Sequence, residues 1–420
     1  MIIQKVRKLF TLAVLLAIVS VAQANDGVYF CNGSQLQPLQ ETDISVKKEV
    51  LNISIGDDGF AYVEVDYEFM NNGSAKTVTM GFEAQPPYND EEPMNKKGIH
   101  PHIKDFTVSI NGNRQSDQNA LVFTKNYMDE WPSELKSRND TLSFVPVDFS
   151  RWDLNDDMPF VLVNRQTKEE ANFAYAYYFD AHFKEGINKV RHTYRYRMSY
   201  GIGRTFSISY WLTPAMRWAN NQIDDFTLRI HADNSTKHFS IICSALDELP
   251  FTVVSGTGKT RLLDLTDMTD EDGNMIPHKG TEVVLRNGVL EWHCKNFKTD
   301  EELEIESADM LQYKTDMPDT EFMLYYDSGE TFNKWGGWWM MYDELYKGPE
   351  NEKQKEAFTA RLRRNLPYAH RGYVFKDAEL RRIFESTWWY MPDPTWKPTS
   401  TSFSRHEQEL IANSDNFADE

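Results

Sequence analysis

The chain has 420 residues, and its 45 Lys and Arg residues are outnumbered by 64 Asp and Glu residues, which gives a formal net charge of −19. An acidic surface repels phosphate backbones and anionic membranes, so this composition argues against nucleic acid as a ligand. The length predicts two or three domains, and an aromatic content of 13% is ample for well-packed cores.

Residues 1–24 have the layout of a secretory signal peptide. Three basic residues precede an apolar run over residues 9–21, and the small-residue sequence Ala22-Gln23-Ala24 follows it. The alternative is a membrane-spanning helix, which needs about 20 apolar residues, more than this run contains. We therefore predict cleavage after Ala24, a mature net charge of −22, and a periplasmic or secreted bacterial protein with no integral membrane segment.

From residue 25 to about residue 316, the chain follows the two-residue period of β-strands. Between Ala61 and Phe69, for example, apolar residues alternate with Tyr, Glu and Asp. Such runs end at Asn-Gly pairs, as at Asn111-Gly112 and Asn287-Gly288, which tolerate the positive φ angles of tight turns. Because helical runs do not intervene, we predict antiparallel β-sandwiches, with a first lobe over residues 25–150 and a second over residues 151–316.

Two segments of the second lobe resemble ligand-binding loops. Residues 255–260 read Ser-Gly-Thr-Gly-Lys-Thr, but a phosphate-binding loop also requires glycine where Val253 stands, so we interpret the segment as a turn between strands. Residues 267–274 are rich in aspartate like the start of a calcium loop. Met275 and Thr281 occupy positions that such a loop reserves for Gly and Glu, so we predict a solvated loop and no metal site.

Three cysteines are present, Cys31, Cys243 and Cys294. In an oxidising compartment this number allows one disulfide and one remaining thiol. Cys243 and Cys294 each continue the apolar face of a predicted strand in the second lobe, so they form the possible disulfide. Three buried free thiols are the alternative, and the state of Cys31 stays open.

Beyond residue 325 the pattern changes to helices. Phe358, Leu362 and Leu366 recur at helical spacing, and Gly372 is placed to end that helix in the left-handed conformation. Asp377 can cap a second helix. We predict a small aromatic-rich helical module over residues 325–398, followed by a polar tail over residues 399–420.

The module resembles the YARHG domain, a family of exported bacterial proteins. The family pattern pairs Arg-Asn with Tyr-Ala-Arg-His-Gly-Tyr-x-Phe and ends in Trp-Tyr-x-Pro. The residues that carry this resemblance are Arg364-Asn365, Tyr368-Ala369, Gly372-Tyr373, Phe375, Leu380, Phe384, Trp389-Tyr390 and Pro392. His370-Arg371 stands in reversed order where the family has Arg-His. The resemblance implies export and supplies no established chemistry.

Residues 25–310 are similar to a β-rich domain of unknown function that occurs in comparable exported proteins. The similarity rests on Asn25-Asp26-Gly27, on the strand and turn over residues 61–84, and on the run from Tyr210 to Trp218. It brings no catalytic residues with it.

Two interpretations of the module remain open. In the first, Asn365, His370 and Arg371 satisfy carbonyls at helix ends, and the aromatic residues form a small core. In the second, the module carries a recognition surface, because aromatic residues and arginine are enriched in binding hot spots. The candidate binding residues are Tyr368, His370, Arg371, Trp388 and Tyr390. Residues 330–398 have a net charge of +2 and residues 25–329 one of −20, so the module is the part able to approach an anionic polymer.

The sequence thus predicts a mainly β protein, with antiparallel β-sandwich lobes followed by a small α-helical module. No nucleophile elbow, catalytic triad or zinc motif is found, and no catalytic residue, cofactor or metal is predicted. We expect an exported, non-catalytic cell-envelope protein whose β scaffold carries a binding module for an unknown envelope protein or glycan. The alternative is an envelope hydrolase that cleaves glycan or peptide with acid and base carboxylates.

Overall fold

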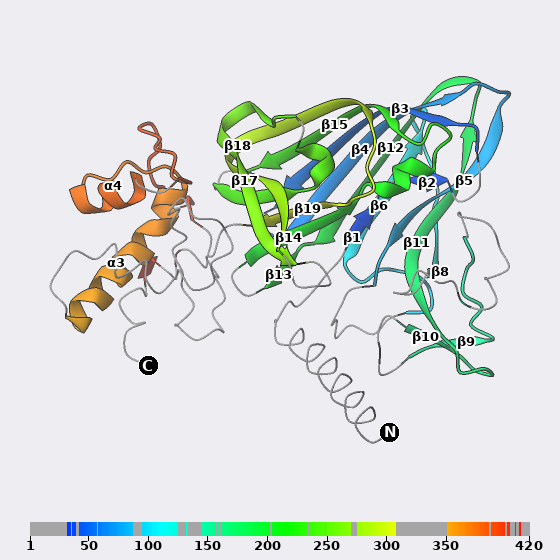
Figure 1. The fold of residues 1–420 in the computed structure, drawn as a ribbon, viewed down its shortest axis with the longest axis horizontal. Helices are drawn as coiled ribbons and strands as arrows, with labels where there is room; N and C mark the ends of the chain where they lie inside the picture. The colour runs from blue at the N-terminus through cyan, green and yellow to red at the C-terminus, as the bar shows by residue number, and fades with distance from the viewer. Residues whose placement is uncertain are drawn as a thin grey trace, which may run out of the picture.

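The protein consists of a large β domain with a small helical module at one end (Figure 1). The computed structural model describes residues 32–34, 36–38, 42–56, 58–86, 95–124, 132, 144–155, 158, 161–201, 204–233, 236–247, 249–269, 275–307, 351–385, 388–399, 401–403, 408 and 411–412. The predicted signal peptide, Cys31 and residues 308–350 lie outside this description.

The larger sheet contains 13 of the described strands. In spatial order its main path runs through β1 (Asn32–Ser34), β14 (Arg204–Trp211), β19 (Leu303–Ser307), β16 (Lys237–Ile242), β18 (Met275–Phe297), β15 (Ile223–Ala232), β3 (Ser45–Ile55), β4 (Phe60–Asn71), β12 (Gly186–Arg197), β6 (Ile103–Ile110) and β7 (Asn113–Arg114). Two further strands branch from this path, β13 (Ser199–Gly201) beside β14 and β17 (Thr252–Thr269) beside β18. Most pairs are antiparallel, as predicted, but β3 pairs with β15 and β1 with β14 in parallel.

The smaller sheet contains six of the described strands and lies against part of the larger one. Its main path runs through β2 (Gln37–Pro38), β5 (Lys76–Ala84), β11 (Glu170–Phe183), β10 (Val161–Asn164) and β9 (Trp152–Leu154), and β8 (Gln118–Thr124) pairs with β11. Two short 3-10 helices, η1 (Thr213–Arg217) and η2 (Ser244–Leu246), connect strands. Phe69 of the larger sheet, Phe183 of the smaller one and Trp218 meet in the core between them, with ring centroids 4.4 to 6.4 Å apart.

The strand pairing does not follow the predicted lobes over residues 25–150 and 151–316. β4 and β12 are paired along 12 residues, and β3 pairs with β15, so each sheet contains strands from both sides of residue 150. The largest hydrophobic core contains residues of both predicted lobes, and so does a smaller, separate core around Phe123 and Trp152. The polar stretch near residue 150 therefore connects elements of one β domain.

The Asn-Gly signals led to different backbone features. Asn111-Gly112 forms the predicted tight turn, between β6 and β7, with φ angles of 50° and 84°. The segment Asn71-Asn72-Gly73 instead carries the chain from β4 in the larger sheet to β5 in the smaller one. Asn287-Gly288, expected to be a turn, lies inside β18.

A long, bent hairpin of β17 and β18 explains why the prediction failed at Asn287-Gly288. Residues 255–260, also expected to be a turn, lie inside β17 and pair with β18, and the register shifts on both sides of Ser255. Gly256 has φ 74° and lies so close to the partner strand that a Cβ there would stand 2.1 Å from the carbonyl oxygen of Asn287. The positive φ angles therefore bend two paired strands together and do not reverse the chain.

The possible disulfide between Cys243 and Cys294 is not formed. Cys243 follows β16, whose Ile241 pairs with Thr281 near the start of β18. Cys294 lies near the other end of β18, opposite Phe226 of β15, and its Sγ donates to the carbonyl of Lys295 at 3.2 Å. The register of β18 thus keeps the two cysteines from facing each other. Cys243 is buried, as the alternative of three buried thiols expects, but Cys294 is only partly buried.

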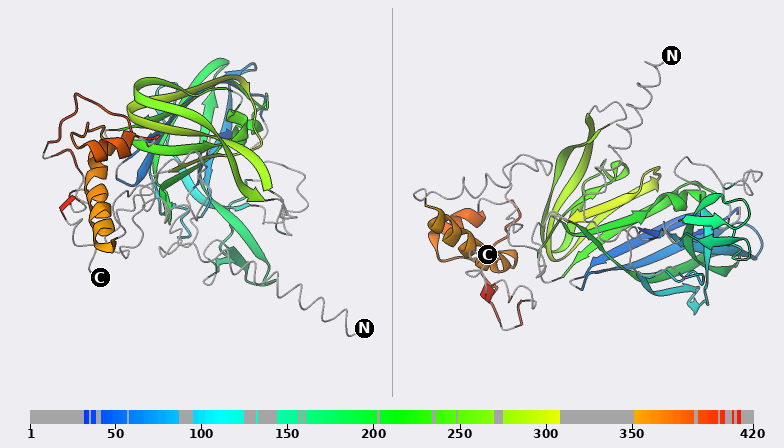
Figure 2. Two further views of the ribbon diagram at one scale, coloured as in Figure 1. Left: turned by 60° about the vertical axis from the view of Figure 1, so that its left-hand side comes forward. Right: turned by 90° about the horizontal axis from the view of Figure 1, so that it is seen from below.

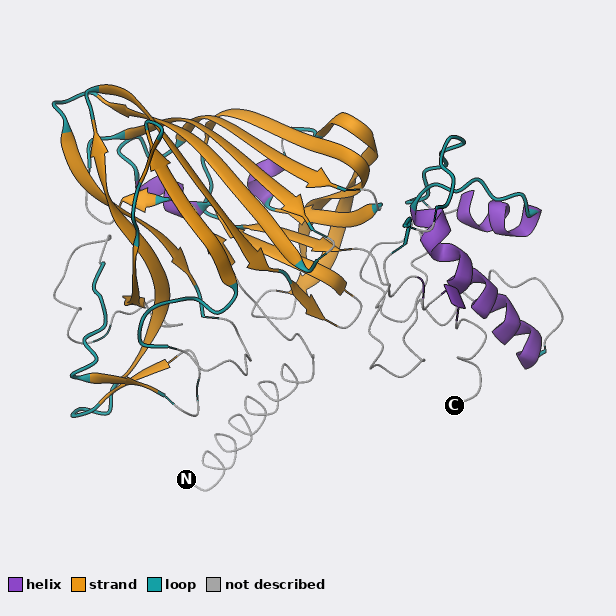
Figure 3. Cartoon of the chain, turned by 180° about the vertical axis from the view of Figure 1, so that it is seen from behind, coloured by secondary structure: helices purple, strands orange, loops and turns teal. Residues whose placement is uncertain are grey.

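The module contains α3 (Glu352–His370) and α4 (Ala378–Glu385), which lie beside the β17–β18 end of the β domain (Figures 1 and 2). Figure 3 shows the same division between strands and helices from behind. The side chain of Asn351 caps α3 by accepting from the backbone N–H of Gln354 at 3.3 Å. Asp377 caps α4 as predicted, accepting from the backbone N–H of Leu380 at 2.9 Å. Among the described residues, no helix has the length and apolar character needed to cross a membrane.

Candidate functional site

The helix end that carries the predicted binding residues closes in a Schellman motif. α3 ends at His370, and Gly372 follows with φ 79°, as predicted. The N–H of Gly372 donates to the carbonyl of Ala369 at 2.9 Å, and the N–H of Tyr373 donates to the carbonyl of Tyr368 at 3.0 Å. These two bonds satisfy carbonyls that every helix end leaves open, and they turn Phe375 back onto Leu362 and Leu366.

Arg371 lies inside the module, with 7% of its surface exposed. Its Nη1 donates to the carbonyl of Pro367 at 3.0 Å, and its guanidinium lies 4.9 Å from the ring centre of Phe403. Asn365 donates in the same way to the carbonyl of Arg361 at 2.8 Å. Arg371 therefore satisfies a carbonyl in the last turn of α3, as the helix-capping interpretation expects, whereas Asn365 bonds to a carbonyl in the middle of the helix.

The aromatic residues of the motif form the core of the module. Phe375 stacks on Phe384 with ring centroids 4.8 Å apart, and Trp389 is buried against the same ring. The hydroxyl of Tyr390 donates to the carbonyl of Tyr373 at 2.6 Å, and burial raises the pKa of Tyr390 to about 12. Tyr368 is half-buried against Tyr373 and Phe403. Tyr390 is therefore buried in the module, whereas Tyr368 keeps part of its surface exposed.

The remaining predicted residues, His370 and Trp388, contact the β domain. The carbonyl of His370 accepts from the N–H of Thr236 at 3.2 Å and also from its hydroxyl. The ring of Trp388 lies 4.4 Å from the guanidinium of Arg261 and 5.0 Å from Nζ of Lys259, both on β17. Of the five predicted binding residues, these two therefore lie at the junction with the β domain, and the other three contact the module itself.

Beneath Trp388 lies a buried charged cluster. Glu282 of β18 is fully buried, and its carboxylate bonds to Nε2 of His238 and Nε of Arg261, both at 2.5 Å. The His238 ring lies 5.8 Å from that of Trp388. A buried carboxylate needs such partners, because leaving it unpaired would cost several kcal/mol. The indole of Trp388 covers the cluster on the module side.

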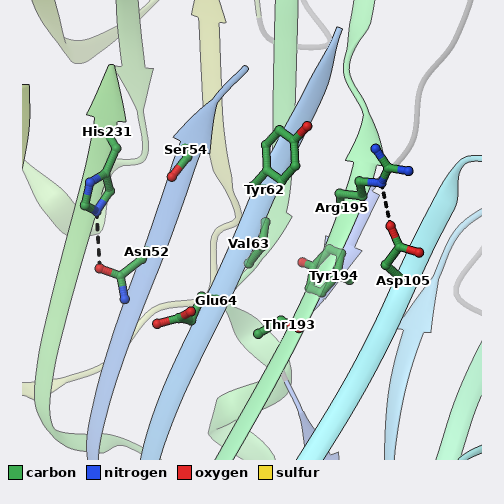
Figure 4. A pocket seen from close by; sticks show the side chains of 10 residues that line it. All are labelled: Asn52, Ser54, Tyr62, Val63, Glu64, Asp105, Thr193, Tyr194, Arg195 and His231. Atoms are coloured by element: carbon green, nitrogen blue, oxygen red, sulfur yellow. Dashed lines mark hydrogen bonds and ion pairs between the residues drawn. The ribbon is translucent and has the colours of Figure 1, made fainter. Parts of the chain in front are cut away.

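A groove on the outer face of the larger sheet is the second candidate site, and sequence reasoning did not find it. It has a volume of about 640 Å³. Side chains of five adjacent strands line it, β15, β3, β4, β12 and β6 (Figure 4). The lining residues are Asn52, Ser54, Tyr62, Val63, Glu64, Asp105, Thr193, Tyr194, Arg195 and His231.

Tyr62 is the exposed aromatic ring of this groove, with 41% of its surface accessible. Its hydroxyl donates to the carboxylate of Asp58 at 2.5 Å, and this bond raises the pKa of Tyr62. Arg195, directly opposite Tyr62 on β12, forms an ion pair with Asp105 at 2.7 Å and lies 5.0 Å over the ring of Phe60. These contacts orient both side chains.

The other polar groups of the groove offer both donors and acceptors. Asn52 and His231 lie 3.4 Å apart on neighbouring strands, and burial lowers the pKa of His231, which favours its neutral form. Glu64 is paired with Arg191. Each carboxylate that lines the groove thus has an arginine partner, Arg195 in the groove for Asp105 and Arg191 outside it for Glu64. Within the described residues, no group of three metal-ligating side chains is gathered here or elsewhere.

The sequence contained one signal for this groove, the alternation that turns Tyr62 and Glu64 away from the core. It contained none for the register that places Arg195 and His231 beside them, because β12 and β15 lie more than 120 residues further along the chain.

Two families match the chain. Residues 338–419 match the YARHG domain, and residues 24–137 match a domain of unknown function, DUF4424. The chain carries a YARHG domain at its C-terminus, preceded by a DUF4424 domain. Both predicted resemblances are confirmed; the YARHG match extends past residue 398, and the β-domain match is shorter than residues 25–310. No curated protein matches the sequence.

Several solved structures resemble the chain. A Legionella pneumophila protein described as a candidate nutrient-binding protein is 14% identical, with a TM-score of 0.47 over 92% of this chain and 97% of that one. An M1 zinc metallopeptidase of Deinococcus radiodurans is 7% identical, with a TM-score of 0.20 over 64% and 43%. Baculovirus P35 is 11% identical, with a TM-score of 0.23 over 65% and 98%. At these scores the likenesses carry no argument about function.

Proposed function

We propose that the protein is an exported, non-catalytic binding protein of the bacterial cell envelope, and that it binds a neutral oligosaccharide in the groove of the β domain. The observation that carries this proposal is the composition of the groove. An exposed aromatic ring, Tyr62, stands among side chains that both donate and accept hydrogen bonds. Sites for small polar ligands combine these elements.

A sugar fits this combination for a chemical reason. The C–H face of a pyranose ring is apolar and can pack on the ring of Tyr62. Its hydroxyls are donors and acceptors at once, so they can bond to amides, hydroxyls and carboxylates such as Asn52 and Glu64. Because Arg195 is paired with Asp105, no unbalanced positive charge is available to attract an anionic ligand. Residues 25–329 carry 29 basic against 49 acidic side chains, which also disfavours anions.

The arrangement supports binding better than hydrolysis. A glycosidase needs one carboxylic acid that stays protonated until it protonates the leaving group, and apolar surroundings usually keep it so. Both carboxylates that line the groove, Glu64 and Asp105, face guanidinium groups instead. The contacts that occupy Trp388, Tyr390 and Arg371 also favour the groove over the module as the binding site.

The experiment is a binding screen of the mature protein on an array of neutral, uronic-acid-containing and amino oligosaccharides. We expect neutral members to bind, Tyr62→Ala to weaken that binding by about tenfold or more, and Tyr62→Phe to retain most of it, because the ring remains. Leu262→Ala is the matched control, since Leu262 is 61% exposed on β17, outside the groove. Binding restricted to anionic members, or equal binding by Tyr62→Ala, would contradict the proposal.

Export is part of the same proposal, and it rests on the layout of residues 1–24. Mass spectrometry of the protein recovered from the cell envelope should find Asn25 as the first residue. A chain that still carries residues 1–24 would contradict it.

A further inference from the structure

Arg286 of β18 contacts two separate parts of the YARHG motif, Gly372 at the end of α3 and the backbone that follows Tyr390. Its Nη1 donates to the carbonyl of Met391, just beyond Trp388-Trp389-Tyr390, at 3.0 Å. On the other side it lies against Gly372, where an added Cβ would stand 2.6 Å from Nη1 and 2.9 Å from Nη2. The guanidinium is therefore held between the backbone of the glycine that ends α3 and the carbonyl that follows the Trp-Tyr pair.

This position suits an arginine for electrostatic and geometric reasons. The C-terminal end of a helix carries a partial negative charge, and Arg286 approaches that end of α3. Arg286 is 5% exposed, so its donors need partners from the protein, and a planar guanidinium can reach more than one partner at once. Asp393 adds a favourable charge nearby, and its N–H donates to the carbonyl of Gly372 at 2.7 Å.

The module contacts other residues of the strands around Arg286, and not Arg286 alone. Val284, two residues before Arg286, is fully buried in the hydrophobic core of the module. Thr236, just before the neighbouring strand β16, bonds to the carbonyl of His370. Lys259 and Arg261 of β17 lie against Trp388. The hairpin β17–β18 and the neighbouring segment before β16 thus present Arg286, one apolar contact and two further cations to the module at fixed relative positions.

We propose that the YARHG module is a receptor for an arginine presented on a β-hairpin, and that in this chain the hairpin β17–β18 occupies the receptor in cis. Gly372 leaves room for this arrangement, because a Cβ there would stand 2.5 Å from the carbonyl oxygen of Met391 and 2.6 Å from Nη1 of Arg286. This proposal concerns a different surface from the groove, and it does not depend on the identity of the groove ligand.

The test asks whether the module stays bound to the β domain once the chain between them is cut. A specific protease sequence is introduced between residues 311 and 350 of the mature full chain, the chain is cleaved, and the products are separated by size-exclusion chromatography at micromolar concentration. We expect the cleaved wild type to elute as one species. We expect Arg286→Ala to separate into two, and Arg286→Lys to weaken the association by about tenfold or more, because lysine keeps the charge and loses the fork.

Two further variants complete the test. Gly372→Val leaves the β domain unchanged and should also release the module, because its side chain would collide with the carbonyl of Met391 and with the guanidinium of Arg286. Arg229→Ala removes a half-exposed arginine of β15 that pairs with Glu291 at 2.8 Å, and it should leave the association intact. Separation of the cleaved wild type, or retention of the module by both Arg286→Ala and Gly372→Val, would overturn the proposal. A dimer of the uncleaved chain that exchanges modules would overturn the assignment in cis.

Discussion

His192 is a histidine buried among aromatic rings. It is fully buried between the sheets, stacked between Tyr67 at 5.7 Å and Tyr194 at 5.8 Å. Neither of its ring nitrogens has a hydrogen-bond partner among the described residues. Burial lowers the pKa of His192 from 6.5 to about 3, because a charged imidazolium cannot be solvated there.

This shift predicts acid sensitivity. The unfolded chain takes up a proton near pH 6.5, whereas the folded chain does so only near pH 3, so stability is lost as the pH falls between these values. For one such histidine the loss at pH 5 is about 2 kcal/mol relative to pH 8. His192→Phe keeps a ring in the stack and should remove this loss. Urea unfolding at pH 5 and pH 8 measures it.

His182 provides the control for that experiment, since it is an exposed histidine on β11. His182→Phe should leave the difference in stability between pH 5 and pH 8 close to that of the wild type. If His192→Phe also leaves the difference unchanged, the buried histidine is not its source.

At the scale of single elements, local rules predicted the helix ends well. Gly372 and Asp377 act within a few residues of their own positions, so their roles as helix stop and helix cap are readable from the sequence. The same reasoning failed for Asn287-Gly288. An Asn-Gly pair indicates a positive φ angle, but it does not determine whether the chain reverses there or stays paired with a neighbouring strand. Pairing with all of β17 decides that β18 continues and bends.

Arg371 gives a prediction for the end of α3. Removing its bond to the carbonyl of Pro367 should lower the local stability of α3 by about 2 kcal/mol, the usual range for a buried hydrogen bond to a charged group. Native-state hydrogen exchange of amides in residues 352–370 measures this in Arg371→Ala. Arg382→Ala, on the exposed surface of α4, should change it by less than about 0.5 kcal/mol. Unchanged exchange in Arg371→Ala would show that Arg371 does not stabilise α3, and would favour its role in binding a partner.

At the scale of the whole molecule, the mainly β class and the helical module could be predicted, and the arrangement of the strands could not. Periodicity identifies the buried face of each strand, as in β4, whose odd-numbered residues from Ala61 to Phe69 point inward. Which strands become neighbours depends on contacts far apart in sequence, such as the parallel pairing of His231 with Ser54. The groove and the junction around Arg286 both arise from such contacts, so no local motif could reveal them.

The two proposals assign different tasks to the two parts of the chain. The β domain would bind the ligand in the groove beside Tyr62, and the module would be held against β17–β18 by Arg286. The aromatic residues of the YARHG motif would then stabilise the protein, because they are buried in the module or against the hairpin.

Hydrogen–deuterium exchange of the mature protein, with and without a neutral oligosaccharide from the array, tests this division most directly. The account predicts that the ligand protects backbone amides of β4 and β12 around Tyr62 and Arg195, and that it leaves residues 368–391 unchanged. Protection confined to residues 368–391 would contradict it, and would place the binding surface on the module.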